Sequence, residues 1–91
     1  MNILIRSNPK NLEHKMEDQF KDPGEHLCYW TFGITPRGKN LKKILFTNGK
    51  NVFAEGEIIA IEDKAIVFKP LKRVEYRQPR SPPTKGFAYV L

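Results

Sequence analysis

Two kinds of side chain in this sequence could act together: aromatic rings that stack on bases and cations that hold phosphates. Tyr29 and Trp30 are adjacent, and a run of basic residues follows them along the chain. A second basic group lies nearer the C-terminus. Stacking rings rimmed by Lys or Arg are the usual means of binding single-stranded nucleic acid. The candidate nucleic-acid-binding residues are Tyr29, Trp30, Arg37, Lys39, Lys42, Lys43, Lys72, Arg73 and Arg77.

The positive charge is concentrated in two blocks of the chain. The 91 residues carry a formal net charge of +6. Residues 27–54 hold five basic side chains and no acidic one, and residues 69–91 hold six basic side chains and one acidic one. We expect residues 37–43 and 72–80 to flank one groove, which would attract polyanions and bind them less tightly at high salt. The alternative is a solvated surface that only keeps the protein soluble.

The role of Trp30 depends on the strand that carries it. Cys28, Trp30 and Phe32 alternate along their segment, so they share one face if the segment is a strand. This alternation favours burial of Trp30 and leaves Tyr29 as the more exposed ring. Cys28 is then a small buried hydrophobic residue.

Catalysis and metal binding have weaker support in the residue pattern. Glu55 and Glu57 lie two residues apart, so they could pair as acid and base on one strand face. Such alternation is more common on the solvated face of an antiparallel sheet. His14 and His26 have no Cys or carboxylate at ligand spacing, so we expect no metal site and no cofactor.

The length and composition restrict the class of protein. A chain of 91 residues is expected to form one domain, residues 1–91, with one modest core. The single Cys excludes a disulfide framework and fits a reducing compartment. Apolar runs such as Ile58 to Ile61 are too short to span a membrane. We therefore expect a small basic domain in the cytoplasm.

The elements that must position the candidate residues are mostly strands. Asn8 followed by Pro9 is a favourable helix start, and Leu12, Met16 and Phe20 recur every four residues. This spacing predicts one amphipathic helix over residues 9–21.

Runs of β-branched and aromatic residues between turn signals predict the strands. The predicted strands are residues 3–5, 27–32, 41–47, 52–61, 65–69, 71–76 and 87–90. Asn48-Gly49 predicts a tight turn, and Gly56 predicts a bulge or bend in the longest strand. The fold class is therefore mainly β with one principal helix (α+β), in a small twisted, partly closed barrel of five to six strands.

Several of these segments are similar to parts of a known superfamily. Residues 52–62 (VFAEGEIIAIE) resemble the long central strand of PUA-like domains, a superfamily that includes the ASCH and EVE families. Residues 66–71 (IVFKPL) resemble the segment that follows that strand, and residues 86–90 (GFAYV) resemble the final strand. Residues 29–33 (YWTFG) are similar to an early aromatic strand of EVE-type members.

The resemblance implies a PUA-like barrel that recognises RNA or a modified base in a groove beside the barrel. RNA is then the first expected partner and DNA the second. A small ASCH-like hydrolase of modified nucleosides is an alternative, since such enzymes work with a Lys, a Thr and a carboxylate. Thr31, Thr35, Lys21 and Glu57 are the residues to test for it. A protein-interaction module without nucleic acid is the remaining alternative.

Overall fold

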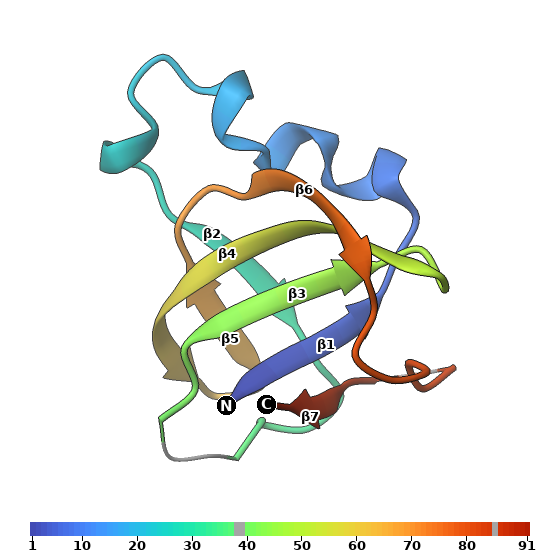
Figure 1. Cartoon of the computed structure of the whole chain (residues 1–91). Coiled ribbons are helices and arrows are strands. Elements are labelled where there is room, and N and C mark those ends of the chain that lie inside the picture. Colours follow the sequence, from blue (N-terminus) through green and yellow to red (C-terminus); the bar gives the residue numbers. More distant parts are fainter. Residues whose placement is uncertain (38–39, 85) are drawn as a thin grey trace.

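The computed structural model describes residues 1–37, 40–84 and 86–91, which form a mainly β molecule (Figure 1). The strands are β1 (Asn2–Arg6), β2 (Cys28–Thr31), β3 (Lys43–Thr47), β4 (Asn51–Glu62), β5 (Ala65–Phe68), β6 (Lys72–Arg77) and β7 (Ala88–Val90). Each of the predicted strand segments forms a strand, and no end differs from the prediction by more than two residues.

All of these strands belong to one mixed sheet, in which β4 pairs with three other strands. The order is β2-β5-β4-β3-β1-β7, and β6 pairs with β4 outside this path. The first half of β4 lies between β3 and β6, and its second half pairs with β5. β1 and β3 are parallel. The sheet has seven strands, not the five to six predicted for the barrel. Its end strands β2 and β7 are not paired with each other, so the barrel is not closed.

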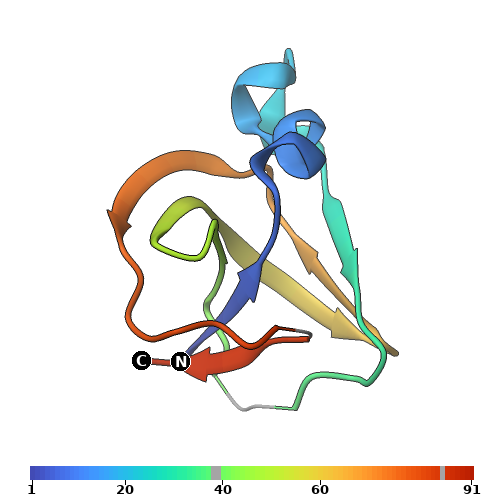
Figure 2. The same cartoon turned by 90° about the vertical axis from the view of Figure 1, so that its right-hand side faces the viewer.

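The helical region predicted over residues 9–21 exists, but it is not one continuous α-helix. It consists of two 3-10 helices, η1 (Pro9–Lys15) and η2 (Glu17–Gln19), and a third one, η3 (Pro23–Glu25), follows. Met16 separates the first two with extended backbone angles, φ −72° and ψ 141°. The three 3-10 helices lie at one end of the molecule, and both termini lie at the other end (Figures 1 and 2).

A tertiary contact interrupts the helix at Met16. Met16 forms a parallel bridge with Leu71, which precedes β6. The Leu71 N–H donates to the Lys15 carbonyl at 2.8 Å, and the Glu17 N–H donates to the Leu71 carbonyl at 2.7 Å. These hydrogen bonds replace those of a helix, because tertiary pairing outweighs weak local propensity. The predicted buried face is nevertheless found, since Leu12 and Met16 are fully buried.

The sheet is buried on both faces where β1 and β3 lie side by side. The outer residues of the triplets Ile3-Leu4-Ile5 and Ile44-Leu45-Phe46 belong to the larger hydrophobic core. The middle residues belong to a second, smaller cluster with Val52 and Val90. Successive strand residues point to opposite faces of the sheet, so an unbroken apolar triplet places side chains in both clusters. The functional surface described below lies on the face of the smaller cluster.

Candidate functional site

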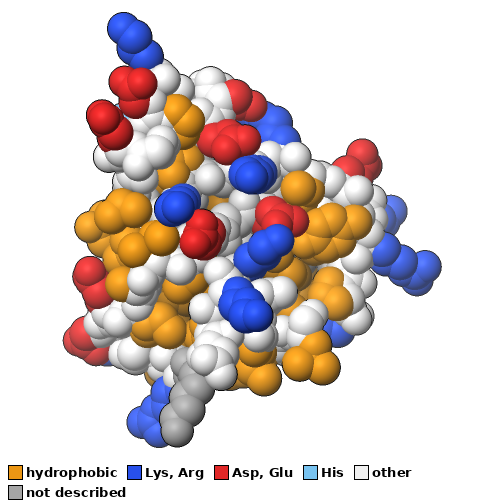
Figure 3. Space-filling model, turned by 60° about the vertical axis from the view of Figure 1, so that its left-hand side comes forward, with side chains coloured by type: hydrophobic (Ala, Val, Ile, Leu, Met, Phe, Trp, Pro, Cys, Tyr) orange, Lys and Arg blue, Asp and Glu red, His pale blue; other side chains and the backbone are white. Residues whose placement is uncertain are grey.

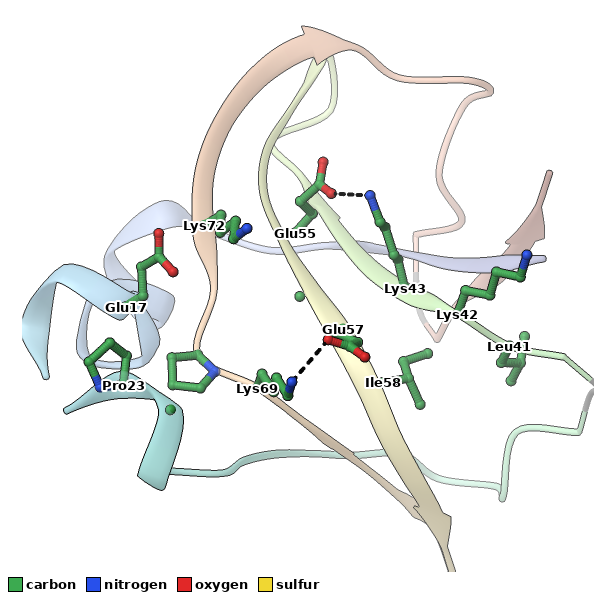
Figure 4. A pocket seen from close by; sticks show the side chains of 13 residues that line it. Glu17, Pro23, Leu41, Lys42, Lys43, Glu55, Glu57, Ile58, Lys69 and Lys72 are labelled. Carbon is green, nitrogen blue, oxygen red and sulfur yellow. Dashed lines mark hydrogen bonds and ion pairs between the residues drawn. The ribbon is translucent and has the colours of Figure 1, made fainter.

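A groove of about 650 Å³ crosses β4 (Figure 4). Its charged residues are Lys42, Lys43, Lys69, Lys72, Glu17, Glu55 and Glu57. Its apolar walls are Leu41, Ile58, Pro23 and Pro70. The groove therefore combines cations, acids and apolar surface.

The strand register explains why side chains distant in sequence meet here. Lys43 of β3 is paired with Glu57 of β4, and Glu55 of β4 is paired with Lys72 of β6. Cross-strand partners lie on the same face of a sheet, so all four side chains share one face. In Figure 4, Lys43 of β3 and the preceding Lys42 lie on one side of β4, whereas Lys69 and Lys72 lie on the other.

Two of the four groove lysines are already neutralised by carboxylates. The Lys43 ammonium lies 2.8 Å from Glu55, and the Lys69 ammonium lies 3.2 Å from Glu57. Lys42 and Lys72 form no ion pair with any acid in the described part of the chain. These two lysines are therefore the groove cations that remain available to an anion.

Glu55 has a second neighbour on the same face. Burial, together with the negative charge of Glu55, raises the pKa of Tyr76 to about 12. The phenol of Tyr76 is consequently a neutral donor over the whole physiological pH range. Figure 3 shows the same mixed character on a larger scale, with basic and acidic side chains alternating over the middle of one face between hydrophobic areas.

Arg73, a predicted phosphate contact, is held by two carboxylates instead. Its guanidinium donates to Glu13 of η1 and to Asp18 of η2. The hydrogen bond with Arg73 lowers the pKa of Asp18 to about 2, and the same carboxylates raise the pKa of Arg73. Arg73 therefore ties β6 to the 3-10 helices.

Two further predicted contacts lie in other depressions of the surface. Arg77 lines a site at the β3–β4 turn with Lys50 and Arg80. Arg37 lines a separate site of about 930 Å³, between the segment that follows β2 and the residues around the start of β7. The Arg37 N–H donates to the Tyr89 hydroxyl at 2.7 Å. Lys39 lies outside the described residues. Of the predicted cations, the structure thus brings only Lys42, Lys43 and Lys72 into one groove.

The predicted stacking rings do not line the groove. Trp30 is half-buried and packs edge-on against Phe46, with ring centroids 5.0 Å apart. Tyr29, on the other face of the edge strand β2, is 52% exposed, and its carbonyl accepts a hydrogen bond from Lys15 Nζ. Burial of Trp30 and exposure of Tyr29 agree with the alternation in the sequence.

A different aromatic cluster, which the sequence did not predict, lines the same site as Arg37. Phe32 packs edge-on against Phe87, and Phe87 packs edge-on against Tyr89. Lys64 lines the same site. The only sequence signal for the cluster is the aromatic content of the two segments. β2 and β7 are not paired in the sheet, so only the tertiary fold brings Phe32 close to Phe87.

The residues suggested for hydrolysis are not gathered in one site. The Thr35 hydroxyl lines the aromatic site, where it donates to Asp63 at 3.0 Å and accepts from the Lys64 N–H at 2.9 Å. Glu57 lies in the groove across β4.

Within residues 1–37, 40–84 and 86–91, no three His, Cys, Asp or Glu side chains are grouped so as to hold a metal ion. None of the described helices has the length and apolarity needed to cross a membrane.

The chain was compared with protein-family models, with curated proteins and with solved structures, and no match was found in any of the three comparisons.

Proposed function

We propose that this protein binds single-stranded nucleic acid, RNA in the first place, in the groove across β4. The observation that carries the proposal is the position of Lys42 and Lys72. They come from the two basic blocks, they make no ion pair with a described acid, and they lie on opposite sides of the same groove (Figure 4). A single strand lying across β4 would place phosphates on both.

The other groove residues suit the bases of such a strand. Leu41 and Ile58 offer apolar surface to a base. Glu55 and Glu57 can accept hydrogen bonds from amino groups on base edges. Because carboxylates repel phosphates, these two side chains suit the bases of the strand and not its backbone. These contacts require exposed base edges, so they favour a single strand over a duplex. The resemblance of residues 52–62 to the central strand of PUA-like domains favours the same function.

Binding to a fluorescent single-stranded RNA, measured by anisotropy at several salt concentrations, tests the proposal. In the double variant Lys42→Gln/Lys72→Gln, two phosphate contacts are lost. The slope of log K against log salt should become shallower by about 1.4, since each contact to a single strand contributes about 0.7. The same measurement with single-stranded DNA determines the preference between the two nucleic acids.

The matched control is Lys10→Gln/Lys21→Gln, which makes the same change in net charge on exposed residues outside the groove. This variant should keep nearly the wild-type slope. An equal loss in both double variants would show a general charge effect, and absence of RNA binding by the wild type would exclude the function.

A further inference from the structure

A second charged depression lies at the start of β4, where the β3–β4 turn meets the end of β6. It measures about 650 Å³, and its cations are Lys50, Arg77 and Arg80. Asn51, Gln78 and Ser81 also line it. No acidic residue is among its lining residues in the described part of the chain, in contrast to the groove across β4.

The three cations of this depression have no carboxylate partner among the described residues. The one side-chain hydrogen bond found for them runs from Arg80 Nε to the Ser81 carbonyl at 3.2 Å. Like charges gathered without a counterion repel one another, and a bound anion relieves that repulsion. Three cations without a lining acid thus distinguish this depression from the groove across β4.

Gln78 holds the two halves of the depression together. Its N–H donates to the Lys50 carbonyl at 3.2 Å, and its side-chain amide donates to the Gly49 carbonyl at 3.1 Å. Its amide oxygen accepts a hydrogen bond of 2.6 Å from the hydroxyl of Thr47, which is fully buried. The segment that carries Arg77 and Arg80 is therefore fixed against the turn that carries Lys50, before any ligand arrives.

We propose that this depression is a preformed binding site for a phosphate group. A guanidinium presents paired N–H donors that match two phosphate oxygens, and the site has two guanidinium groups. The Lys50 ammonium and the Ser81 hydroxyl are further donors. A phosphate monoester, which carries close to two negative charges, fits three uncompensated cations better than a singly charged carboxylate does.

The phosphate can be inorganic phosphate or the terminal phosphate of a nucleic acid. Arg77 lies five residues along β6 from Lys72, a distance of about 17 Å in a strand. A strand bound in the groove could therefore reach the depression with its end. Binding of a nucleic-acid terminal phosphate at this site rests on the proposed function, whereas binding of inorganic phosphate does not.

The first experiment titrates the full chain with inorganic phosphate and follows backbone amide signals by NMR. The amides of Gly49, Lys50 and Gln78 should shift in a saturable manner, and chloride at the same ionic strength should not cause the shift. In Arg77→Gln/Arg80→Gln the affinity should fall about tenfold or more, because charge-assisted hydrogen bonds are lost. Lys10→Gln/Lys21→Gln should leave it unchanged. Shifts that do not saturate, or equal losses in both variants, overturn the proposal.

A variant that leaves the charge unaltered tests the role of Gln78. In Gln78→Ala the three cations remain but their segments are no longer held together, so phosphate binding should weaken severalfold. Wild-type phosphate affinity in folded Gln78→Ala would show that the depression is not preformed. Where Gln78→Ala impairs folding, Lys50→Gln, at an exposed turn position, tests instead whether the turn supplies a cation to the site, and wild-type phosphate affinity in Lys50→Gln would contradict that.

The second experiment compares the same RNA with a 5′ phosphate and with a 5′ hydroxyl. The phosphate should tighten binding severalfold in the wild type, and not in Arg77→Gln/Arg80→Gln. If inorganic phosphate binds and neither RNA binds, the phosphate site stands and the proposed function fails. If both RNAs bind equally and inorganic phosphate does not bind, the proposed function stands and the phosphate site fails.

Discussion

At the scale of single residues, the basic side chains differ in what already holds them. Arg73 is bound by Glu13 and Asp18, and Lys43 is paired with Glu55. Lys42, Lys72 and Arg77 have no such partner among the described acids. Net charge counts all of these side chains equally, but an anion meets only those that are free. The available cations are therefore fewer than the charge of +6 and its two blocks suggest.

The ion pair between Asp18 and Arg73 predicts a pH dependence of stability. The pKa of Asp18 is lowered from 3.8 to about 2 in the folded protein, so its charged form favours folding above pH 3.8. That contribution is lost as the pH falls through about 2. In Asp18→Asn, the decrease in unfolding free energy from pH 4 to pH 2 should be smaller than in the wild type. Urea denaturation followed by circular dichroism at both pH values measures it.

Asp22→Asn is the control for this experiment, because Asp22 is exposed and forms no ion pair in the described part of the chain. It should retain the wild-type difference between the two pH values. The same pH dependence in Asp18→Asn and the wild type would contradict a stabilising Asp18–Arg73 pair.

At the scale of elements, β4 positions the groove because it changes partners along its length. Its register is irregular between Val52 and Ala54 and again between Ile58 and Ala60. Between these points, β4 leaves β6 and begins to pair with β5. Gly56 itself is paired in regular register with Ile44 of β3, so the bulge predicted at the glycine is not found there, and the irregular positions lie on either side of it.

Gly56 allows the close approach of the chain between β5 and β6. A Cβ atom at this position would lie 2.9 Å from Leu71 Cδ2 and 3.0 Å from the Lys69 carbonyl oxygen. Gly56→Ala therefore requires the fully buried Leu71 side chain to shift and crowds the Lys69 carbonyl, so it should lower the unfolding free energy by about 1–3 kcal/mol. Thermal and urea unfolding of the variant provide the measurement.

Gly33→Ala is the matched control, since a Cβ at Gly33 has no neighbour within 4 Å and the residue lacks a positive φ. Its stability should remain within about 0.5 kcal/mol of the wild type. If the two alanine variants were equally stable, close packing at Gly56 would not be the reason for the glycine.

At the scale of the whole molecule, two hydrophobic clusters share one sheet. The smaller cluster lies on the same face as the groove, because Leu45 is paired in register with Glu55. The groove is thus continuous with a packed part of the protein. This packing keeps β3, β4 and β6 in the arrangement that places Lys42 and Lys72 on opposite sides of the groove.

The smaller cluster should contribute to stability as a true core does. Leu45 is 4% exposed, so Leu45→Ala should reduce the unfolding free energy by about 2–5 kcal/mol. Ile34→Ala, at a position that is 68% exposed, should change it by less than about 0.5 kcal/mol. Urea unfolding, monitored by circular dichroism and by Trp30 fluorescence, measures both. Near-wild-type stability of Leu45→Ala would mean that the second cluster is not tightly packed.

The sequence by itself determined the strands, the turns and the mainly β class. These features depend on local causes: alternating or unbroken apolar runs, and turn residues such as Asn48 and Gly49, whose φ is 104°. It also indicated that Trp30 faces the core and Tyr29 the solvent, since neighbouring strand residues point to opposite faces.

Only the tertiary structure decided which distant residues meet. The bridge between Met16 and Leu71 divides the predicted helix, and the carboxylates of η1 and η2 bind Arg73. The pairing of Glu55 with Lys72, and the hydrogen bond from the Ile58 N–H to the Lys42 carbonyl, bring Lys42 and Lys72 to one groove across β4. These outcomes depend on the free energy of contacts between segments far apart in the chain, and local spacing carries no information about those contacts.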